Sequence, residues 1–280
     1  MKLKRIKIKA PAKINLFLAV TGRRENGYHN LSTVMQTISL YNEIKLEKAE
    51  KIEVIFSSGP FSGVSNAEKA LIVLSERVGK PLNCRIKIKE RIPTLSGLGG
   101  SSSDAAAVLV GANKLFSLGL TDEELMETGF KIGADVPFLI KGGIALCEGV
   151  GEEITPIKPL PDCFVLVARP KTGNKTPEVF SRFREEGEFS HSPKEEFLKA
   201  LEEENLSAIC SSLRNDLSPF AGEESDSLRK VMMEKGAIAA VLTGSGSAVF
   251  ALFSTRKQRN KAYKSLKKLE GVKAFKVKAI

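Results

Sequence analysis

Apolar and polar residues alternate with a period of two over the first part of the chain, which is the pattern of half-buried β-strands. One strand is predicted over residues 6–10 and is expected to end at Pro11, because proline has no backbone N–H for a strand ladder. A second strand, over 13–20, places Lys13 and Asn15 side by side on one face. The next predicted elements are a polar loop over 23–30 and strands over 33–40, 43–46, 52–56 and 84–92.

Helical spacing of apolar residues first appears over residues 66–78. The alanine-rich stretch 105–116 predicts a second helix, and Thr121 to Glu124 form a capping-box sequence that opens a third. Because strands and helices mix without regular strand–helix–strand alternation, the predicted fold class is α+β. The remaining predicted elements are strands over 163–168 and 272–277, a strand–glycine turn–strand over 239–253, and helices over 194–213, 226–235 and 257–269.

The sequence composition changes after residue 153, where three prolines are clustered. Pro156, Pro159 and Pro161 fall within a few residues of each other, which is typical of a linker between domains. We therefore expect an N-terminal domain over 1–155 and a C-terminal domain over 156–280.

Composition narrows the class of protein. The chain has 280 residues, of which 42% are hydrophobic, so it can bury a sizeable core. It has no run of about 20 apolar residues that would predict a membrane span, and its start lacks the apolar segment of a secretory signal. The four cysteines are scattered and predict free thiols in a reducing compartment, and neither histidine lies near a cysteine pair as a zinc site would require. A cytoplasmic protein is expected.

The net charge of +10 permits two interpretations. A basic surface can bind nucleic acid, or it can attract a polyphosphate such as ATP. Aromatic residues make up only 6% of the chain, with no tryptophan, and they are not interleaved with lysine and arginine as in a single-strand binding surface. We expect no nucleic-acid partner.

The strongest chemical signal is the glycine- and serine-rich segment 93–107, which runs from a predicted strand into a helix. Glycines allow the backbone to approach a ligand closely, and the first amides of a helix favour an anion. The segment is neither a Walker loop, since no Gly-Lys-Ser/Thr follows, nor a dinucleotide fingerprint, since Ser102 holds the place of the third glycine. It predicts a polyphosphate cradle, and the alternative is a plain loop with a serine N-cap.

This segment, Pro93-Thr-Leu-Ser-Gly-Leu-Gly-Gly-Ser-Ser-Ser103, resembles the phosphate-binding motif of the galactokinase–homoserine kinase–mevalonate kinase–phosphomevalonate kinase (GHMP) superfamily. Residues 10–18 resemble the N-terminal motif of these kinases, and Leu242 to Phe250 resemble their C-terminal glycine motif. Within the superfamily, residues 22–29 and Gly133-Ala-Asp-Val-Pro-Phe138 are most similar to the 4-diphosphocytidyl-2-C-methyl-D-erythritol kinases.

The resemblance implies roles for two charged residues. Asp135 resembles the aspartate that accepts the proton of the attacking hydroxyl, and Lys13 resembles the lysine that offsets charge on the transferred phosphoryl group. Read from the residues alone, Asp135 also fits the start of a short helix and Lys13 a solvated strand position.

Binding residues follow from the same resemblance. Asn15 resembles a residue that bonds the acceptor's sugar-alcohol hydroxyls, Tyr28 and His29 resemble the cytosine site, and Thr176, Pro177 and Phe180 resemble the second wall of that pocket. Asn66 is predicted near the adenine. The ATP site is implied for Pro93, Leu95, Ser96, Gly97, Leu98, Gly99, Gly100, Ser101, Ser102 and Ser103.

Two positions depart from the family pattern, since Ser96 and Ser101 stand where glycine is common. The glutamate that helps to hold magnesium in several superfamily members has no assigned equivalent, so the metal ligands stay unknown.

The resemblance implies an N-terminal domain like domain 2 of ribosomal protein S5, a ferredoxin-like C-terminal domain, and ATP and the acceptor meeting in the cleft between them. It implies that the chain uses ATP and Mg²⁺ to phosphorylate a hydroxyl of 4-diphosphocytidyl-2-C-methyl-D-erythritol in the non-mevalonate isoprenoid pathway, as a monomer or weak homodimer. The alternatives are a mevalonate, homoserine or sugar kinase of the same superfamily, or a basic nucleic-acid-binding module.

Overall fold

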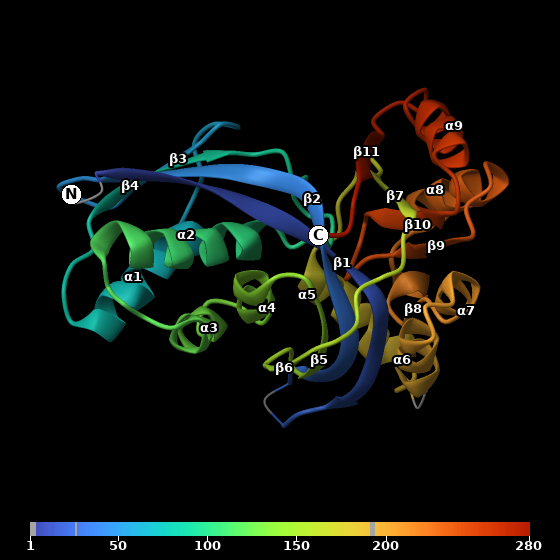
Figure 1. Cartoon of the computed structure of the whole chain (residues 1–280), viewed down its shortest axis with the longest axis horizontal. Helices are drawn as coiled ribbons and strands as arrows, with labels where there is room; N and C mark the ends of the chain where they lie inside the picture. Colours follow the sequence, from blue (N-terminus) through green and yellow to red (C-terminus); the bar gives the residue numbers. More distant parts are fainter. Residues whose placement is uncertain (1–3, 26, 191–193) are drawn as a thin grey trace. The chain divides into compact units, whose positions relative to one another are not determined.

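Two long neighbouring strands, β1 (Arg5–Arg23) and β2 (His29–Lys48), organise the computed structural model, which describes residues 4–25, 27–190 and 194–280 (Figure 1). The prediction that Pro11 ends a strand is wrong, because the fixed φ of proline suits extended backbone. The carbonyl of Pro11 accepts a hydrogen bond from Ser103 Oγ at 2.6 Å. Likewise, the strands predicted over 33–40 and 43–46 are parts of the single strand β2.

The chain forms two compact units, and each is described by itself. Unit 1 contains Met1–Ala12, Leu40–Pro93 and Gly99–Gly142, and unit 2 contains Lys13–Ser39, Thr94–Leu98 and Gly143–Ile280. Strands β1 and β2 therefore each contribute residues to both units. The domain boundary expected at residue 155 stays a prediction.

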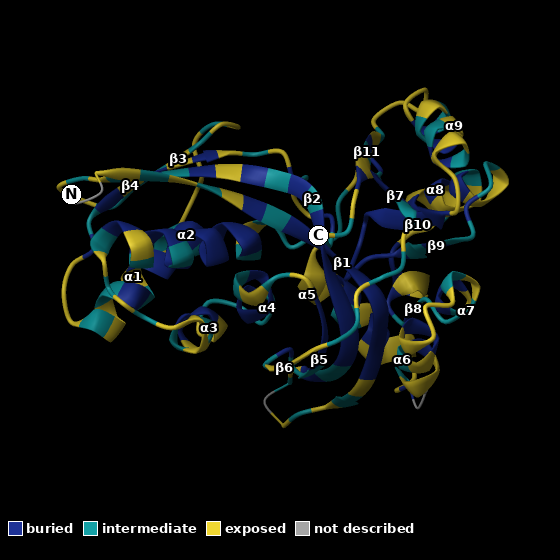
Figure 2. Ribbon diagram, viewed as in Figure 1, coloured by how far each residue is buried: buried dark blue, intermediate teal, exposed yellow. Residues whose placement is uncertain are grey.

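In unit 1, β2 pairs with β4 (Cys84–Lys89), which pairs in parallel with β3 (Glu53–Phe56). The helices of this unit lie on one side of these strands (Figure 1). The central helix α2 is buried over most of its length, as its dark colour in Figure 2 shows. The helices are α1 (Asn66–Val78), α2 (Gly100–Phe116), α3 (Asp122–Phe130) and α4 (Asp135–Lys141).

Local sequence signals explain the ends of these helices. Ser65 caps α1 by accepting a hydrogen bond from the Glu68 amide, and Gly79 ends the helix in a left-handed conformation. The predicted capping box is confirmed, because Thr121 and Glu124 each bond the other's backbone N–H at the start of α3.

Unit 2 contains a four-stranded antiparallel sheet with the order β11-β7-β10-β9. Helices α8 (Glu223–Glu234) and α9 (Arg256–Leu266) pack on it and share its hydrophobic core. In chain order, β7, α8, β9, β10, α9 and β11 give the β-α-β-β-α-β order of a ferredoxin-like fold, and the segment 170–222 is inserted between β7 and α8. The strands are β7 (Phe164–Arg169), β9 (Ala239–Leu242), β10 (Val249–Phe253) and β11 (Lys273–Val277).

Several elements of unit 2 have no clear periodicity in the sequence. Strand β5 (Ile144–Gly149) pairs with β2 and with β6 (Glu153–Pro156), and β8 (Arg214–Asn215) pairs in parallel with β1. The helix predicted over 194–213 is two helices, because Glu204 between them has a φ of +52°. The remaining helices are α5 (Thr176–Glu186), α6 (Lys194–Glu202), α7 (Leu206–Ser211) and the 3₁₀ helix η1 (Ser218–Phe220).

The predicted α+β class is confirmed by this mixture of sheets and helices. Within the described part of the chain, no helix has the length and apolar character needed to cross a membrane.

The close packing of α2 on strands β1 and β2 within unit 1 gives a first prediction. A Cβ on Gly111 would lie 2.4 Å from Leu46 Cδ1 and 2.8 Å from Ile8 Cδ1. We expect Gly111→Ala to lower the free energy of unfolding by about 1–2 kcal/mol, because displacing two packed side chains costs up to about 3 kcal/mol, against a gain of about 1 kcal/mol from replacing glycine inside a helix. Urea unfolding measures this, and an unchanged or higher midpoint would contradict the packing described.

Candidate active site

The unit 2 part of the glycine–serine loop, Thr94–Leu98, is held through its carbonyl groups. The carbonyl of Leu95 accepts from the Asn174 amide at 3.1 Å, and that of Ser96 accepts from the Ala248 amide at 3.0 Å. The carbonyl of Leu98 accepts from the Lys13 amide at 3.0 Å. Three segments distant in sequence therefore fix the path of this part of the loop.

Gly97 lies against the turn that joins β9 to β10. Its φ is +76°, and a Cβ here would lie 2.1 Å from the carbonyl oxygen of Thr243 and 3.0 Å from the Gly246 amide. The obstacles are backbone atoms, which cannot turn aside as a side chain can. Glycine at position 97 therefore allows the phosphate-loop motif to contact the C-terminal glycine motif.

In unit 1, α2 begins at Gly100, and its N-cap is Gly99 with a φ of +71° and no side-chain cap. The alternative of a serine N-cap is therefore wrong. Ser103, which is buried, uses its hydroxyl to donate to Pro11 instead. Since the first amides of a helix have no intrahelical partner, the uncapped start of α2 suits an anion such as phosphate.

A buried pair supports this helix start. Asp104 is 6% exposed and accepts a hydrogen bond from Asn42 Nδ2 at 2.9 Å. Asn42 Oδ1 accepts from the amides of Arg91 and Ile92, at 2.8 and 2.9 Å. Burial raises the pKa of Asp104 to about 7, the negative charge of Glu90 adds to the rise, and the bond from Asn42 opposes it.

Asp135 is the first residue of α4, so the helix-start interpretation is confirmed as a description of its local structure. The preceding turn lies near the phosphate-loop helix, since a Cβ on Gly133 would be 4.0 Å from Ser102 Oγ. A carboxylate at the first turn of a helix is favoured by the helix dipole.

Lys13, in unit 2, is only 4% exposed, so its interpretation as a solvated strand lysine is wrong. Its Nζ donates to Asn15 Oδ1 at 2.7 Å. Asn15 is equally buried, with its Nδ2 donating to Thr33 Oγ1 and its backbone amide donating to Thr243 Oγ1, both at 2.9 Å. Burying a charged group is costly, and the hydrogen bond to Asn15 offsets part of that cost.

The predicted base-binding residues also lie in unit 2. The rings of His29 and Phe180 stack with centroids 5.0 Å apart. Tyr28, which precedes His29 in the sequence, is 67% exposed. Within the described residues, Nε2 of His29 is buried without a hydrogen-bond partner. Burial lowers the pKa of His29, and the charges of Arg184 and Arg23 lower it further, so the imidazole is neutral near pH 7.

Thr176 and Pro177 open helix α5, which carries Phe180. Thr176 Oγ1 lies 2.8 Å from the hydroxyl oxygen of Ser245, so the start of α5 contacts the C-terminal glycine turn. Of the three residues predicted to form the second wall of the cytosine pocket, Phe180 is the one whose ring stacks on His29 in the described structure. Asn26, in the motif spanning residues 22–29, lies outside the described residues.

The other predicted nucleotide-site residues are placed individually. Asn66 is the first residue of α1, directly after its cap Ser65. Leu95 is 54% exposed and has a φ of +52°, an uncommon conformation for a side chain of this size. No described contact of Asn66 tests the expected proximity to adenine, which stays a prediction.

Comparisons with known proteins identify the family. The model of the GHMP kinases N-terminal domain matches residues 65–143, and that of the GHMP kinases C-terminal domain matches residues 195–270. The 4-diphosphocytidyl-2-C-methyl-D-erythritol kinase of Caldicellulosiruptor bescii is 39% identical over 278 residues, which cover 96% of this chain and 95% of that protein. The chain belongs to the GHMP kinases.

Two further comparisons agree on the branch of the GHMP kinases. The 4-diphosphocytidyl-2-C-methyl-D-erythritol kinase of Clostridium tetani is 38% identical, with 94% of this chain and 96% of that protein covered. A crystal structure of 4-(cytidine 5'-diphospho)-2C-methyl-D-erythritol kinase matches with a TM-score of 0.80 and 32% identity, covering 98% of this chain and all of that one. The predicted family and its two-domain GHMP kinase architecture are confirmed.

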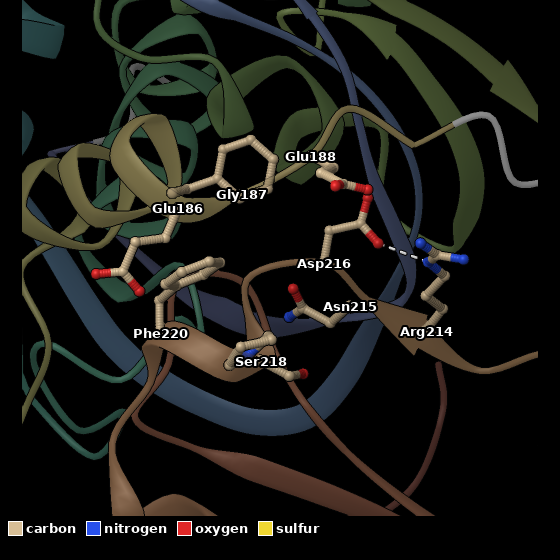
Figure 3. Close-up of a pocket in the computed structure, with 10 residues that line it drawn as sticks. Glu186, Gly187, Glu188, Arg214, Asn215, Asp216, Ser218 and Phe220 are labelled. Atoms are coloured by element: carbon tan, nitrogen blue, oxygen red, sulfur yellow. Dashed lines mark hydrogen bonds and ion pairs between the residues drawn. The ribbon is translucent and has the colours of Figure 1, made fainter.

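A cavity of about 540 Å³ in unit 2 does not coincide with the residues expected from the GHMP kinase motifs (Figure 3). It lies between the end of α5 and residues 214–220, and among the described residues it shares Phe183 with the ring contacts of His29. Its carboxylate Asp216 already accepts hydrogen bonds from the Val20 amide and from Arg214. The contacts of the motifs, rather than this cavity, therefore define the candidate site.

Sequence reasoning assigned no role to Thr33, Asn42 or Asp104. Thr33 was visible only as one residue of a predicted strand, and the pairing of Asn42 with Asp104 joins positions 62 residues apart. Among the described residues, no cluster of three or more histidine, cysteine, aspartate or glutamate side chains forms a metal site.

The close approach at Gly97 predicts the effect of one methyl group. Gly97→Ala is expected to abolish thermal stabilisation by ATP–magnesium, because the added Cβ displaces the loop from Thr243. Gly119→Ala is the matched control: Gly119 has nearly the same φ, +75°, but nothing within 4 Å of an added Cβ. Equal loss of ATP stabilisation in both variants would mean that backbone strain, and not the contact with Thr243, is responsible.

The raised pKa of Asp104 predicts a pH-dependent stability. Above a folded pKa of about 7 the native state holds a buried carboxylate, and this penalty disappears as pH falls toward the ordinary value of 3.8. Asp104→Asn should therefore raise the free energy of unfolding above pH 7 and have progressively less benefit toward pH 4. Urea unfolding of both proteins across this range measures the difference, and a pH-independent difference would contradict it.

Proposed function

We propose that this chain transfers the γ-phosphate of ATP to a hydroxyl of 4-diphosphocytidyl-2-C-methyl-D-erythritol, a step of isoprenoid synthesis by the non-mevalonate pathway. The observation that carries the proposal is near full-length similarity, at 36–39% identity, to kinases named for this substrate. Several contacts of the motif residues are consistent with it, as the next paragraphs describe.

The phosphates of ATP are proposed to bind at the uncapped start of α2, where glycine leaves room for the ligand and helix amides are directed at it. The hydroxyls of Ser101 and Ser102 lie in the same first turn. Mg²⁺ takes oxygen ligands and retains several waters, so one serine hydroxyl with phosphate oxygens and water suits it. When bound, the ion neutralises charge on the phosphates.

Asp135 is proposed to accept the proton of the attacking hydroxyl, and Lys13 to offset negative charge on the transferred group. Phosphoryl transfer depends mainly on positioning and electrostatic stabilisation, which a buried, oriented ammonium group provides. The hydrogen bond to Asn15 holds Lys13 in one orientation.

The cytosine base is proposed to bind near Tyr28, His29 and Phe180. The unpartnered Nε2 of His29 is the polar atom suited to the edge of a base, because a neutral imidazole offers one donor and one acceptor. Phe180 provides a ring beside it. The bonding of Asn15 to the hydroxyls of the acceptor stays a prediction, and the second hydrogen on its Nδ2 is the group suited to it.

An acceptor panel tests the function directly. ADP release is measured with 4-diphosphocytidyl-2-C-methyl-D-erythritol, the same alcohol without its cytidyl group, mevalonate, homoserine and a sugar. We expect turnover that depends strongly on the cytidyl group. Turnover with another alcohol would assign a different GHMP acceptor, while salt-sensitive oligonucleotide binding without ATP stabilisation would indicate a nucleic-acid-binding module. A cytoplasmic location and a monomer or weak homodimer remain parts of the proposal.

The roles of the two charged residues give a separate prediction. Asp135→Asn and Lys13→Ala should each lower kcat by about two orders of magnitude or more, because each removes a group that acts in the transition state. Thermal stabilisation by ATP–magnesium should persist in both. Near-normal kcat in both variants would refute these roles.

A further inference from the structure

Thr33 has an unusual position for a buried threonine, because its hydroxyl connects a backbone carbonyl to the side chain that holds Lys13. It lies on β2, is 3% exposed, and donates through Oγ1 to the carbonyl of Phe17 at 2.7 Å. The same oxygen accepts from Asn15 Nδ2 at 2.9 Å.

The direction of these hydrogen bonds follows from chemistry. A threonine hydroxyl has one hydrogen, and the carbonyl of Phe17 can only accept it. Toward Asn15, Thr33 therefore acts only as an acceptor, so the side-chain atom of Asn15 that faces it must be the NH₂ nitrogen. The amide oxygen of Asn15 then necessarily points the other way.

That oxygen meets two donors on the opposite side. Asn15 Oδ1 accepts from Lys13 Nζ at 2.7 Å and from Thr243 Oγ1 at 3.3 Å. With the amide reversed, its NH₂ group would face the ammonium group of Lys13, and two donors would oppose each other. Thr33 thus excludes the orientation of Asn15 that repels Lys13.

We propose that Thr33 is a positioning residue for the phosphoryl-transfer reaction, acting through Asn15 to orient the ammonium group of Lys13. The proposal rests on the proposed role of Lys13 in transfer. Thr33 itself contacts no reacting atom in this account, so its effect should appear in kcat rather than in nucleotide affinity.

Thr37 supplies a matched control on the same strand. Four residues from Thr33, it lies on the same face of β2, is 2% exposed, and donates to the carbonyl of Ile280 at 2.8 Å while accepting from the Gly143 amide at 2.9 Å. Thr37→Val removes an equally buried hydroxyl that does not touch Asn15.

The test combines kinetics with an amide-specific measurement. Thr33→Val should lower kcat at least tenfold with the KM for ATP unchanged, Thr33→Ser should remain within threefold of the unaltered chain, and Thr37→Val should leave kcat unchanged. In an Asn15→Ala background, Thr33→Val should cause no further loss. A loss of kcat in Thr37→Val equal to that in Thr33→Val, or an additive loss in the Asn15→Ala background, overturns the proposal.

The side-chain NH₂ signals of Asn15 in an NMR spectrum give an answer independent of the acceptor. Their exchange with solvent should be slow in the unaltered chain, in Thr33→Ser and in Thr37→Val, and faster in Thr33→Val. Unchanged exchange in Thr33→Val overturns the positioning role. Absence of phosphoryl transfer by the unaltered chain would instead refute the proposed function.

Discussion

The candidate site depends on the close approach of two backbone segments, the loop at Gly97 and the turn at Thr243. A separation that leaves no room for a Cβ requires glycine, and it is maintained by hydrogen bonds that the backbone amides of Lys13, Asn174 and Ala248 donate to carbonyls of the loop. The carbonyls of Leu95, Ser96 and Leu98 all accept these hydrogen bonds, so backbone contacts within unit 2 hold this part of the loop in place. The loop continues into α2, whose N-terminus has no side-chain cap.

Lys13 illustrates how a charged residue acquires a fixed position. Its backbone amide anchors the phosphate loop at Leu98, while its side chain donates to Asn15. The same residue therefore links loop geometry to the placement of a positive charge. Burying an ammonium group is expensive in free energy, and the hydrogen bond to Asn15 offsets part of that cost at a position that is 4% exposed.

Sequence periodicity predicted the local elements better than their connections. The helix over 66–78 and the capping box at Thr121 depend on neighbouring residues, and both are confirmed. The continuation of β1 through Pro11 was missed. Proline lacks a backbone N–H, but its fixed φ fits an extended strand, and the sequence alone does not show which of these two properties decides. Strand β5, over residues 144–149, was also missed, because its pairing with β2 joins segments more than 100 residues apart. The sequence motifs predicted which residue types make up the candidate site. The contacts of Asn15 with Thr33 and Thr243 could not be predicted from the sequence, because they join residues on separate elements.

Two buried asparagines have parallel functions in the two units. In unit 2, Asn15 accepts from Lys13 and donates to Thr33; in unit 1, Asn42 accepts from two loop amides and donates to Asp104. Each amide is oriented because its donor and acceptor sides have different obligatory partners, and such satisfied networks specify a single local geometry. Because Asn15 lies on β1 and Asn42 on β2, these two strands also position polar side chains of the candidate site. Hydrogen bonds of backbone groups and side-chain amides thus fix the surroundings of the phosphate-loop motif within each unit.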